Sequence, residues 1–319
     1  MRSSVNKLYK HAIIVMFLIG ICISTVFFSI QPDANHYFQS SKLKLNLLKT
    51  TPSPRIIVIG GSNIAFGIDS QLIEMAFGIP VINDGLHGGL GVAPLRELRD
   101  YIKKGDIIIV SLEYTNFVGK NQMNGNAGVL SDWIEFSPKR INYLESPWKE
   151  AIPLYAIMLQ RKVNREINLE LVGSGMDEIR GIFTGNHFNE YGDFIGHLND
   201  IPTKPKDIPS DGYAVSPLYE GIFIFLEDFN QYATAKGATV YFEAQSSRQT
   251  NCDNTGIEKM IGFFDTFREK TTIPVITPMD QLCMADRYFF DTPFHLNSKG
   301  RKLRTERLIR DLKKYIDLP

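Results

Sequence analysis

Residues 55–67 read RIIVIGGSNIAFG, and this stretch decides the fold. Its first six residues form a short apolar run of the kind that is buried as a strand in a parallel sheet. A second glycine follows at once, and the glycine pair permits a sharp turn and a close approach of the backbone. We therefore expect a strand at 55–60 that ends in a tight turn carrying Ser62.

Apolar runs and helical patterns alternate beyond this strand. Further strands are expected at residues 80–83, 106–112, 238–242 and 273–276. Helices are expected at residues 69–77, 93–103, 219–236, 255–270 and 298–315. This alternation is typical of a parallel sheet covered by helices on both faces. The predicted fold class is therefore α/β, with three layers.

The alternation stops between residues 113 and 215, which are rich in Asn, Gly, Tyr and Pro. This segment is too long to be a plain loop, so we interpret it as an insertion in a domain spanning residues 55–319. Residues 31–54 contain scattered prolines and lysines and are expected to form a tether in front of that domain.

The N-terminal region contains an uncharged apolar run. Residues 12–30 read AIIVMFLIGICISTVFFSI, which is close to the roughly 20 residues that a membrane-spanning helix needs. Basic residues precede the run and Asp33 follows it, so residues 1–11 are predicted to be cytoplasmic and the rest of the chain extracytoplasmic. A cleaved signal peptide is the alternative, although its apolar core usually has only about 7–15 residues.

The composition excludes some classes of function. The formal net charge is zero, so nothing supports a nucleic-acid partner. The three cysteines, Cys22, Cys252 and Cys283, include no C-x-x-C pair, and no zinc or redox site is expected. Cys252 and Cys283 either pair in an oxidising compartment or stay as free thiols. No cofactor is predicted.

Ser62 stands where chemistry is expected. In parallel sheets, ligands bind beyond the carboxyl ends of the strands, and Ser62 follows the first strand directly. Free N–H groups of Ser62 and Asn63 at such a turn can stabilise an oxyanion. Two simpler interpretations stand beside this one. Ser62 can cap a helix, or the turn can bind phosphate, although the Walker lysine is missing.

A second group of polar residues precedes the last expected helix. Asp291 and His295 are separated there by a short loop. A serine hydroxyl needs a base to become a nucleophile, and a carboxylate can orient an imidazole for that role. The simpler interpretation is a loop in which Asn297 or Ser298 caps the following helix.

Together these two segments resemble the SGNH (GDSL-like) hydrolase superfamily. The resemblance implies that Ser62 is the nucleophile, His295 the base and Asp291 its orienting partner. The usual G-D-S reads G-G-S here, and the usual D-x-x-H has one more residue, which keeps Asp286 as an alternative partner. The α/β-hydrolase elbow G-x-S-x-G fits less well, because Ile64 replaces its second glycine.

The same resemblance implies an oxyanion site. The family takes one donor from a glycine after the second strand, where Gly85, Gly88 and Gly89 are all open and Gly88 is our working candidate. It takes another from an asparagine after the third strand. Asn116 is the candidate for that role, although the usual G-x-N-D is absent.

A few other residues are considered for binding. Asp193 and His197 have helix-like spacing and can share a face. We favour a turn and packing role for them, then substrate contact, and no metal site, since a metal needs at least one more ligand. Asn63 is a further candidate for substrate contact. His87 is expected to satisfy a hydrogen bond within its loop.

The overall plan resembles membrane-anchored extracytoplasmic proteins that act on envelope polymers, of the D-alanyl transfer and alginate O-acetylation type. This implies acyl transfer through acyl-Ser62, with water or a sugar hydroxyl as acceptor. The implied partners are an acylated glycan or envelope polymer, lipid around residues 12–30 and a membrane-bound O-acyltransferase. The alternative is a non-catalytic domain that binds a glycan or scaffolds such a transferase.

Overall fold

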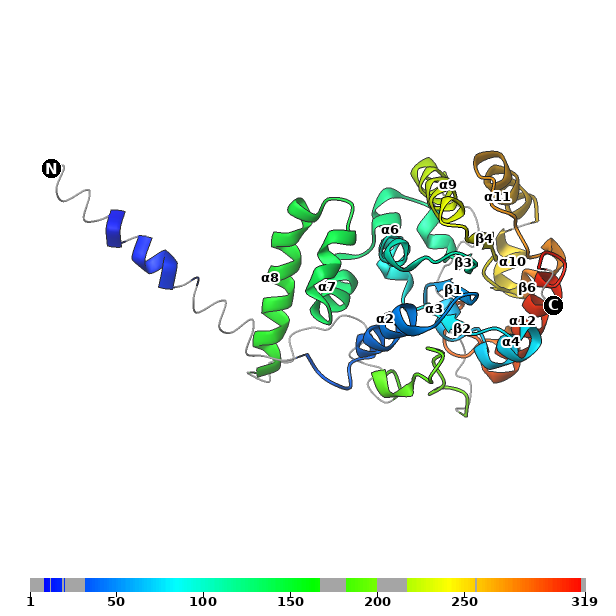
Figure 1. The fold of residues 1–319 in the computed structure, drawn as a ribbon, viewed down its shortest axis with the longest axis horizontal. Helices are drawn as coiled ribbons and strands as arrows, with labels where there is room; N and C mark the ends of the chain where they lie inside the picture. The colour runs from blue at the N-terminus through cyan, green and yellow to red at the C-terminus, as the bar shows by residue number, and fades with distance from the viewer. Residues whose placement is uncertain are drawn as a thin grey trace.

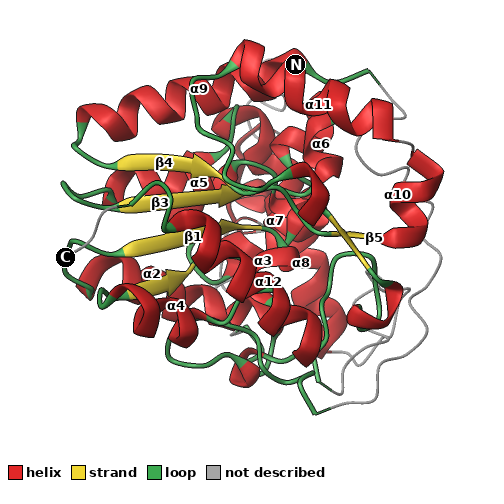
Figure 2. Ribbon diagram, turned by 90° about the vertical axis from the view of Figure 1, so that its right-hand side faces the viewer, coloured by secondary structure: helices red, strands yellow, loops and turns green. Residues whose placement is uncertain are grey.

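The computed structural model describes residues 9–11, 13–18, 20, 32–166, 182–199, 217–255 and 257–316. A four-stranded parallel sheet with the order β2-β1-β3-β4 lies at its centre (Figure 2). The strands are β1 (Ile56–Gly60), β2 (Val81–Asn83), β3 (Ile107–Ser111) and β4 (Thr239–Phe242). β1 and β3 are buried along their whole length, as their apolar runs predict.

Helices cover both faces of this sheet. One face packs against α5 (Ala93–Leu98), α9 (Glu220–Ala235) and α11 (Ile257–Lys270). The other face packs against α4 (Ser70–Phe77) and α12 (Ser298–Leu312). Successive residues of the strands point to opposite faces, so each strand contributes to both apolar cores. The predicted α/β class, with helices on both sides of a parallel sheet, is confirmed.

The strand expected at residues 273–276 is wrong in extent. Only Val275 forms a bridge there, parallel to Phe242 at the end of β4. Pro274 explains the short pairing, because proline has no N–H to donate to a ladder. This segment continues the sheet by one residue pair rather than by a full strand.

The tether expected at residues 31–54 is also wrong over much of its length. It contains a 3-10 helix, η1 (Tyr37–Gln39), and the helix α2 (Ser40–Thr50). Leu48 is buried in the core, and the Lys44 ammonium is buried where it donates to two backbone carbonyls. A lysine that looks like a linker residue in the sequence can thus be buried when carbonyl oxygens accept hydrogen bonds from its ammonium group.

The region between β3 and β4 contains several helices. They are α6 (Lys120–Asn124), α7 (Ala127–Glu135) and α8 (Pro147–Glu166). α7 and α8 pack together and contribute to a second apolar core that includes Trp133. Of the expected insertion, residues 167–181 and 200–215 lie outside the described residues.

The described parts of the N-terminus are helical. Apolar side chains at residues 13–18 are exposed, and this segment lies apart from the rest of the described chain (Figure 1). Within the described residues, no helix is long and apolar enough to cross a bilayer. Residues 12, 19 and 21–30 of the expected span lie outside the described residues, so the membrane anchor stays a prediction.

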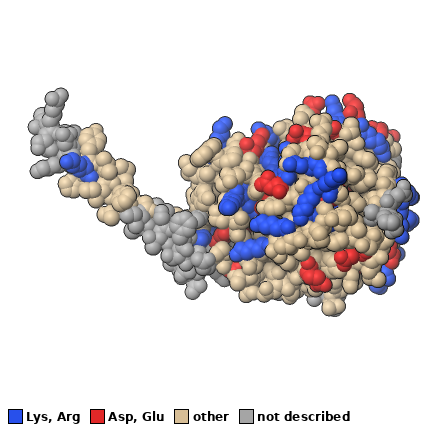
Figure 3. Space-filling model, in the orientation of Figure 1, with Lys and Arg blue, Asp and Glu red and all other residues tan. Residues whose placement is uncertain are grey.

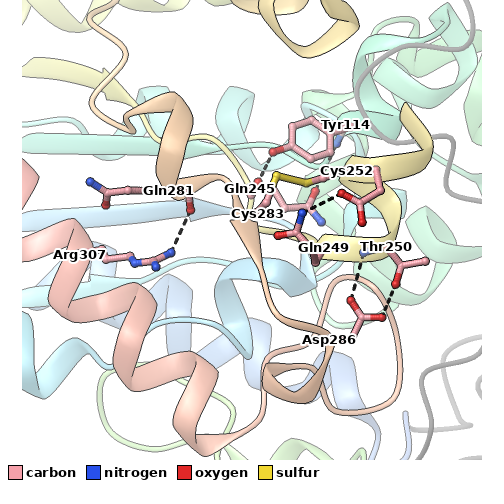
Figure 4. Close-up of a disulfide and its surroundings, with 10 residues drawn as sticks. Tyr114, Gln245, Gln249, Thr250, Cys252, Gln281, Cys283, Asp286 and Arg307 are labelled. Carbon is pink, nitrogen blue, oxygen red and sulfur yellow. Dashed lines mark hydrogen bonds between the residues drawn. A yellow bond between two sulfur atoms is a disulfide. The ribbon is translucent and has the colours of Figure 1, made fainter. Parts of the chain in front are cut away.

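A disulfide lies near one end of the sheet. Cys252 of α10 (Gln249–Thr255) and Cys283 of β6 (Cys283–Met284) are bonded, which decides the alternative left open by the sequence (Figure 4). β6 pairs in parallel with β5 (Ser247–Arg248), so the disulfide joins a helix to a short two-stranded sheet. The bond fixes the start of the loop that leads to Asp291.

Candidate active site

The carboxyl end of β1 carries Ser62. The short helix α3 (Ser62–Ala65) starts directly after the turn at Gly61. Ser62 is partly exposed, whereas Ile64 and Ala65 of the same helix are buried. β1 is flanked by β2 and β3, so Ser62 lies at the middle of the sheet edge where such folds bind ligands.

Asp291 and His295 are in contact. His295 Nδ1 and Asp291 Oδ1 are 2.8 Å apart, and the two side chains are only 13% and 17% exposed. The loop between them is closed by an antiparallel bridge from Phe289 to Leu296 and by Thr292 Oγ1, which accepts from the N–H of His295. This turn accommodates the extra residue in the D-x-x-x-H spacing.

The alternative partner Asp286 is engaged elsewhere. Its carboxylate accepts a hydrogen bond from the Thr250 hydroxyl at 2.6 Å (Figure 4). It also accepts one from Arg248 at 2.8 Å. Burial is the largest single influence on Asp286 and raises its pKa. The hydrogen bonds from Thr250 and Arg248 together outweigh it, so the pKa is lowered overall. Asp291 is therefore the carboxylate that orients His295.

Phe66 holds the His295 ring beside the turn that carries Ser62. The two rings are stacked with centroids 3.9 Å apart and an interplanar angle of 7°. Phe66 caps the end of α3, which begins with Ser62. With Nδ1 bound to Asp291, Nε2 is the nitrogen of His295 that is left to act as a base.

Glu113 is a site residue that the sequence analysis passed over. Its Oε1 lies 3.1 Å from both the backbone nitrogen and the hydroxyl of Ser62. Burial raises the pKa of Glu113, and the charge of His295 and the hydrogen bonds from Ser62 oppose that rise. Ser62, Glu113 and His295 are thus neighbours. The available signal was an ionisable residue directly after the uncharged run at residues 107–112.

The two oxyanion candidates, Asn116 and Gly88, lie in different surroundings. Asn116 does not offer a donor to Ser62, because its Nδ2 donates to the carbonyls of Gly88 and Gln122, both at 3.0 Å. Its expected role is corrected to that of a loop support. Gly88 is the glycine that adjoins the site, since a Cβ on Gly61 would lie 2.8 Å from its nitrogen.

Two of the expected substrate contacts are buried instead. Asn63 is fully buried, and its Nδ2 donates to the carbonyl and the hydroxyl of Ser111 at 3.2 Å. Asp193 is also fully buried, and its carboxylate accepts from Arg301 at 2.7 Å and from the Ser70 hydroxyl at 2.6 Å. Both residues support the backbone around the site, so the proposed substrate contacts are wrong.

Two further histidines, His197 and His87, have structural roles. His197 is buried, and its Nε2 lies 2.9 Å from the carbonyl of Leu296, next to His295. It lies in a turn rather than on a helix, so it does not share a helical face with Asp193. The Nδ1 of His87 accepts from the N–H of Gly89 at 2.9 Å, which confirms the expected loop hydrogen bond.

A buried arginine that the sequence analysis also missed ties these elements together. Arg304 of α12 donates to the carbonyl of Asn63 at 2.6 Å and to the Ser111 hydroxyl at 3.1 Å. Its Nε also donates to Glu243 at 2.8 Å, just after β4. The final helix thereby holds the Ser62 turn against the strand ends. In the sequence, Arg304 looked like one more basic residue of an amphipathic helix.

The fold and this cluster describe an α/β protein with a serine, a histidine and two carboxylates at the carboxyl edge of a parallel sheet. Over the part of the chain that the structure describes, no group of three or more His, Cys, Asp or Glu side chains is arranged to hold a metal ion. A scan against models of protein families gives no match for this chain, and a search of curated proteins gives none either.

Proposed function

We propose that this protein is a serine-dependent acyl ester hydrolase or O-acyltransferase of the SGNH type, with Ser62 as nucleophile. One observation carries the proposal: the Asp291–His295 pair, bonded at 2.8 Å, is stacked on Phe66 beside the Ser62 turn. A serine, a base and an orienting carboxylate around one point are what nucleophilic acyl transfer requires.

The reaction follows from these positions. Ser62 Oγ attacks the acyl carbonyl while His295 Nε2 takes its proton, and Asp291 stabilises the imidazolium that forms. The ester C–O bond then breaks, His295 protonates the leaving alcohol, and acyl-Ser62 remains. An incoming hydroxyl reverses these steps. Water as acceptor makes the protein an esterase, and a sugar hydroxyl makes it a transferase.

The proposed location is the outer side of a membrane. The apolar run at residues 12–30 is proposed as a single-pass anchor in lipid, with the N-terminus cytoplasmic. The Cys252–Cys283 disulfide supports an extracytoplasmic domain, because disulfides persist mainly in oxidising compartments. The proposed substrate is an acylated envelope glycan or polymer, and a membrane-bound O-acyltransferase is the proposed protein partner.

A second function is favoured by a specific contact. Oε1 of Glu113 accepts a hydrogen bond from the N–H of Ser62, which would otherwise be free to bind an oxyanion. A domain in this arrangement can bind a glycan or scaffold a membrane acyltransferase without catalysis of its own. The face drawn in Figure 3 carries basic side chains with acidic side chains among them.

The test uses the full-length protein in detergent and a fluorophosphonate probe. We expect the wild type to be labelled and to hydrolyse p-nitrophenyl acetate, and Ser62→Ala to do neither. Ser298→Ala is the matched control, because that exposed serine starts α12 beyond the reacting loop. Equal turnover in wild type and Ser62→Ala would reject the mechanism. A wild type that neither labels nor turns over any acyl donor, with or without a membrane acyltransferase, would leave the binding function.

A further inference from the structure

The carboxyl group of Glu113 lies in a space that the chain keeps open for it. Two glycines border this space. A Cβ on Gly61 would lie 2.3 Å from Oε1, and a Cβ on Gly88 would lie 2.0 Å from Oε2. Both distances are far shorter than any real contact, so a side chain at either position would push the carboxyl out. The turn after β1 and the loop after β2 thus jointly position Glu113 against Ser62.

The surroundings of Glu113 disfavour a charge. Burial raises its pKa, and the charge of His295 and the hydrogen bonds from Ser62 and from the Asn63 backbone oppose that rise. Tyr37 of η1 also interacts with Glu113, but its hydroxyl donates to the carbonyl of Leu86, and burial raises the pKa of that phenol. Burial lowers the pKa of His87 to about 4, so that neighbour is neutral near pH 7. Burial therefore shifts Glu113 toward its neutral acid form.

An oxyanion and an ionised Glu113 cannot share this space without a large cost. Both would lie within hydrogen-bonding distance of the Ser62 N–H, and two negative charges at such a separation repel strongly in a buried site. A neutral carboxyl group in the same place has an O–H, which would donate a hydrogen bond to the oxyanion. The usual asparagine donor is missing, since Asn116 is bound to loop carbonyls.

We propose that Glu113, in its protonated form, is a catalytic residue that donates a hydrogen bond to the oxyanion and completes the oxyanion hole with the Ser62 N–H. This inference rests on the proposed acyl-transfer function. The Oγ–carbon bond forms as the Ser62 proton moves to His295, and the carbonyl electron pair moves to the oxygen held by Glu113 and the Ser62 N–H. When the pair returns, the ester C–O bond breaks and His295 gives its proton to the leaving alcohol. The Glu113 proton is never transferred.

Two substitutions separate this role from that of a base. Glu113→Gln keeps the size of the side chain and an N–H donor, but it cannot accept the Ser62 proton. Glu113→Ala removes the donor. Loss of one oxyanion donor typically costs about 10²–10³-fold in rate. We therefore expect Glu113→Gln to react within about tenfold of wild type, and Glu113→Ala to react about 10²–10³-fold more slowly.

The pH dependence gives a signature that a purely structural role would not produce. The neutral acid is the donor, so wild-type reactivity should fall on the alkaline side as pH passes the raised pKa of Glu113. Glu113→Gln has no proton to lose at this position and should lack that fall. The ratio of the wild-type rate to the Glu113→Gln rate cancels the rise that both proteins show as the His295 base loses its proton. A ratio that stays level or rises toward alkaline pH overturns the inference.

The experiment measures the rate of fluorophosphonate labelling over a pH series, on the full-length protein in detergent, with melting temperatures to check folding. A wild type that labels no faster than Ser62→Ala refutes the proposed function, and this inference with it. A labelled wild type with an inert, folded Glu113→Gln refutes the inference alone, because Glu113 would then be a base. Equal rates for the Gln and Ala variants also overturn it. An infrared band of a protonated carboxyl group that is lost in Glu113→Gln supports it.

Discussion

Two acidic residues in this chain stand four positions before a histidine, and the two pairs behave in opposite ways. Asp291 and His295 bind each other at 2.8 Å. Asp193 instead binds Arg301 at 2.7 Å, and His197 binds the carbonyl of Leu296 at 2.9 Å. Identical spacing therefore produces a partly exposed, hydrogen-bonded pair in one loop and two separate structural anchors in the other.

The difference comes from the partners that each backbone offers. The Asp291 loop is closed on itself, and the His295 ring is held by Phe66, so the carboxylate and the imidazole meet. Asp193 accepts hydrogen bonds from three residues, Ser70, Asn83 and Asn189, and it also pairs with the buried guanidinium of Arg301. A buried cation and several N–H groups outcompete a neighbouring imidazole for a carboxylate. The spacing identifies a possible Asp–His pair, and the hydrogen-bond donors around the aspartate determine whether the pair forms.

The largest effect that separates the pairs is expected from Asp291→Asn. The imidazole of His295 would lose the partner that fixes its tautomer and stabilises its charge, so labelling and ester turnover should fall by about 10³–10⁴-fold. The fold should be unaffected, because the carboxylate is near the surface. Probe kinetics and a thermal melt measure the two quantities.

Asp286→Asn is the matched control for this prediction. Asp286 lies in the same loop but binds Arg248 and Thr250. Its variant should keep labelling and turnover close to wild type. Equal losses of activity in the two variants would show that the loop as a whole, rather than the Asp291–His295 bond, matters for the reaction.

The next effect is on stability, from Asp193→Asn. Arg301 would remain buried without its main counter-charge, and breaking a buried pair in this way costs about 3–5 kcal/mol. Asp69 lies 3.5 Å from Arg301 and retains part of the compensation, so we expect a loss of about 3 kcal/mol in the free energy of unfolding. Denaturant titration measures it.

The control for Asp193 comes from the same helix α12. Glu306 pairs with Lys302 at 3.9 Å, and both side chains are more than half exposed. Exposed pairs contribute little, so Glu306→Gln should change stability by less than about 0.5 kcal/mol. An Asp193→Asn variant as stable as Glu306→Gln would refute the view that Asp193 is a buried anchor.

Local apolar patterns were enough to predict most of the sheet. Apolar runs without charge identified β1 and β3, because a strand buried on both faces must be apolar throughout. The same rule failed at residues 273–276, where Pro274 limits pairing. It also missed α2, whose lysines look like those of a linker until Lys44 meets carbonyl oxygens from distant segments.

Only those site residues could be predicted whose place follows from the nearby sequence. Ser62 follows a strand, and Asp291 and His295 share a loop, so motif position identifies them. Glu113 and Arg304 depend on partners 51 and 61 residues away, Ser62 and Glu243, respectively. No spacing rule connects such residues, because the connection exists only once the strands are placed side by side.

The histidines of the two pairs can be compared through pH. Burial lowers the pKa of His197 to about 4. The unfolded chain then binds protons more readily than the folded chain between about pH 6.5 and 4. The contribution of His197 to the free energy of unfolding is therefore complete above about pH 6.5. It falls as pH drops toward about 4, by up to about 3 kcal/mol for one such group. His87 has a similarly lowered pKa and adds a similar loss.

His197→Asn should flatten this acid dependence without abolishing it, since His87 stays. The measurement is the unfolding free energy from urea titrations at several pH values between 5 and 6.5. Burial raises the pKa of Asp84 to about 7, but that group is present in both proteins and its effect cancels in the comparison. The slope of stability against pH should be smaller in the variant than in the wild type. Parallel curves would mean that His197 takes up a proton in the folded protein as easily as in the unfolded chain.

The smallest expected effect concerns Phe66, whose ring contacts both His295 and His197. Its centroid lies 3.9 Å from that of His295 and 4.8 Å from that of His197. Aromatic pairs contribute about 0.5–1.5 kcal/mol beyond burial, so Phe66→Leu should lower stability by about 1–2 kcal/mol. Labelling should slow only a few-fold, because Asp291 still orients His295 after its flat support is gone. Phe267→Leu in α11 removes a comparable buried ring, stacked on Phe242 at 4.3 Å and remote from the loop, and should lower stability without slowing labelling. If both variants label at the wild-type rate, Phe66 only fills the core, and the alignment of His295 depends on Asp291 and its closed loop alone.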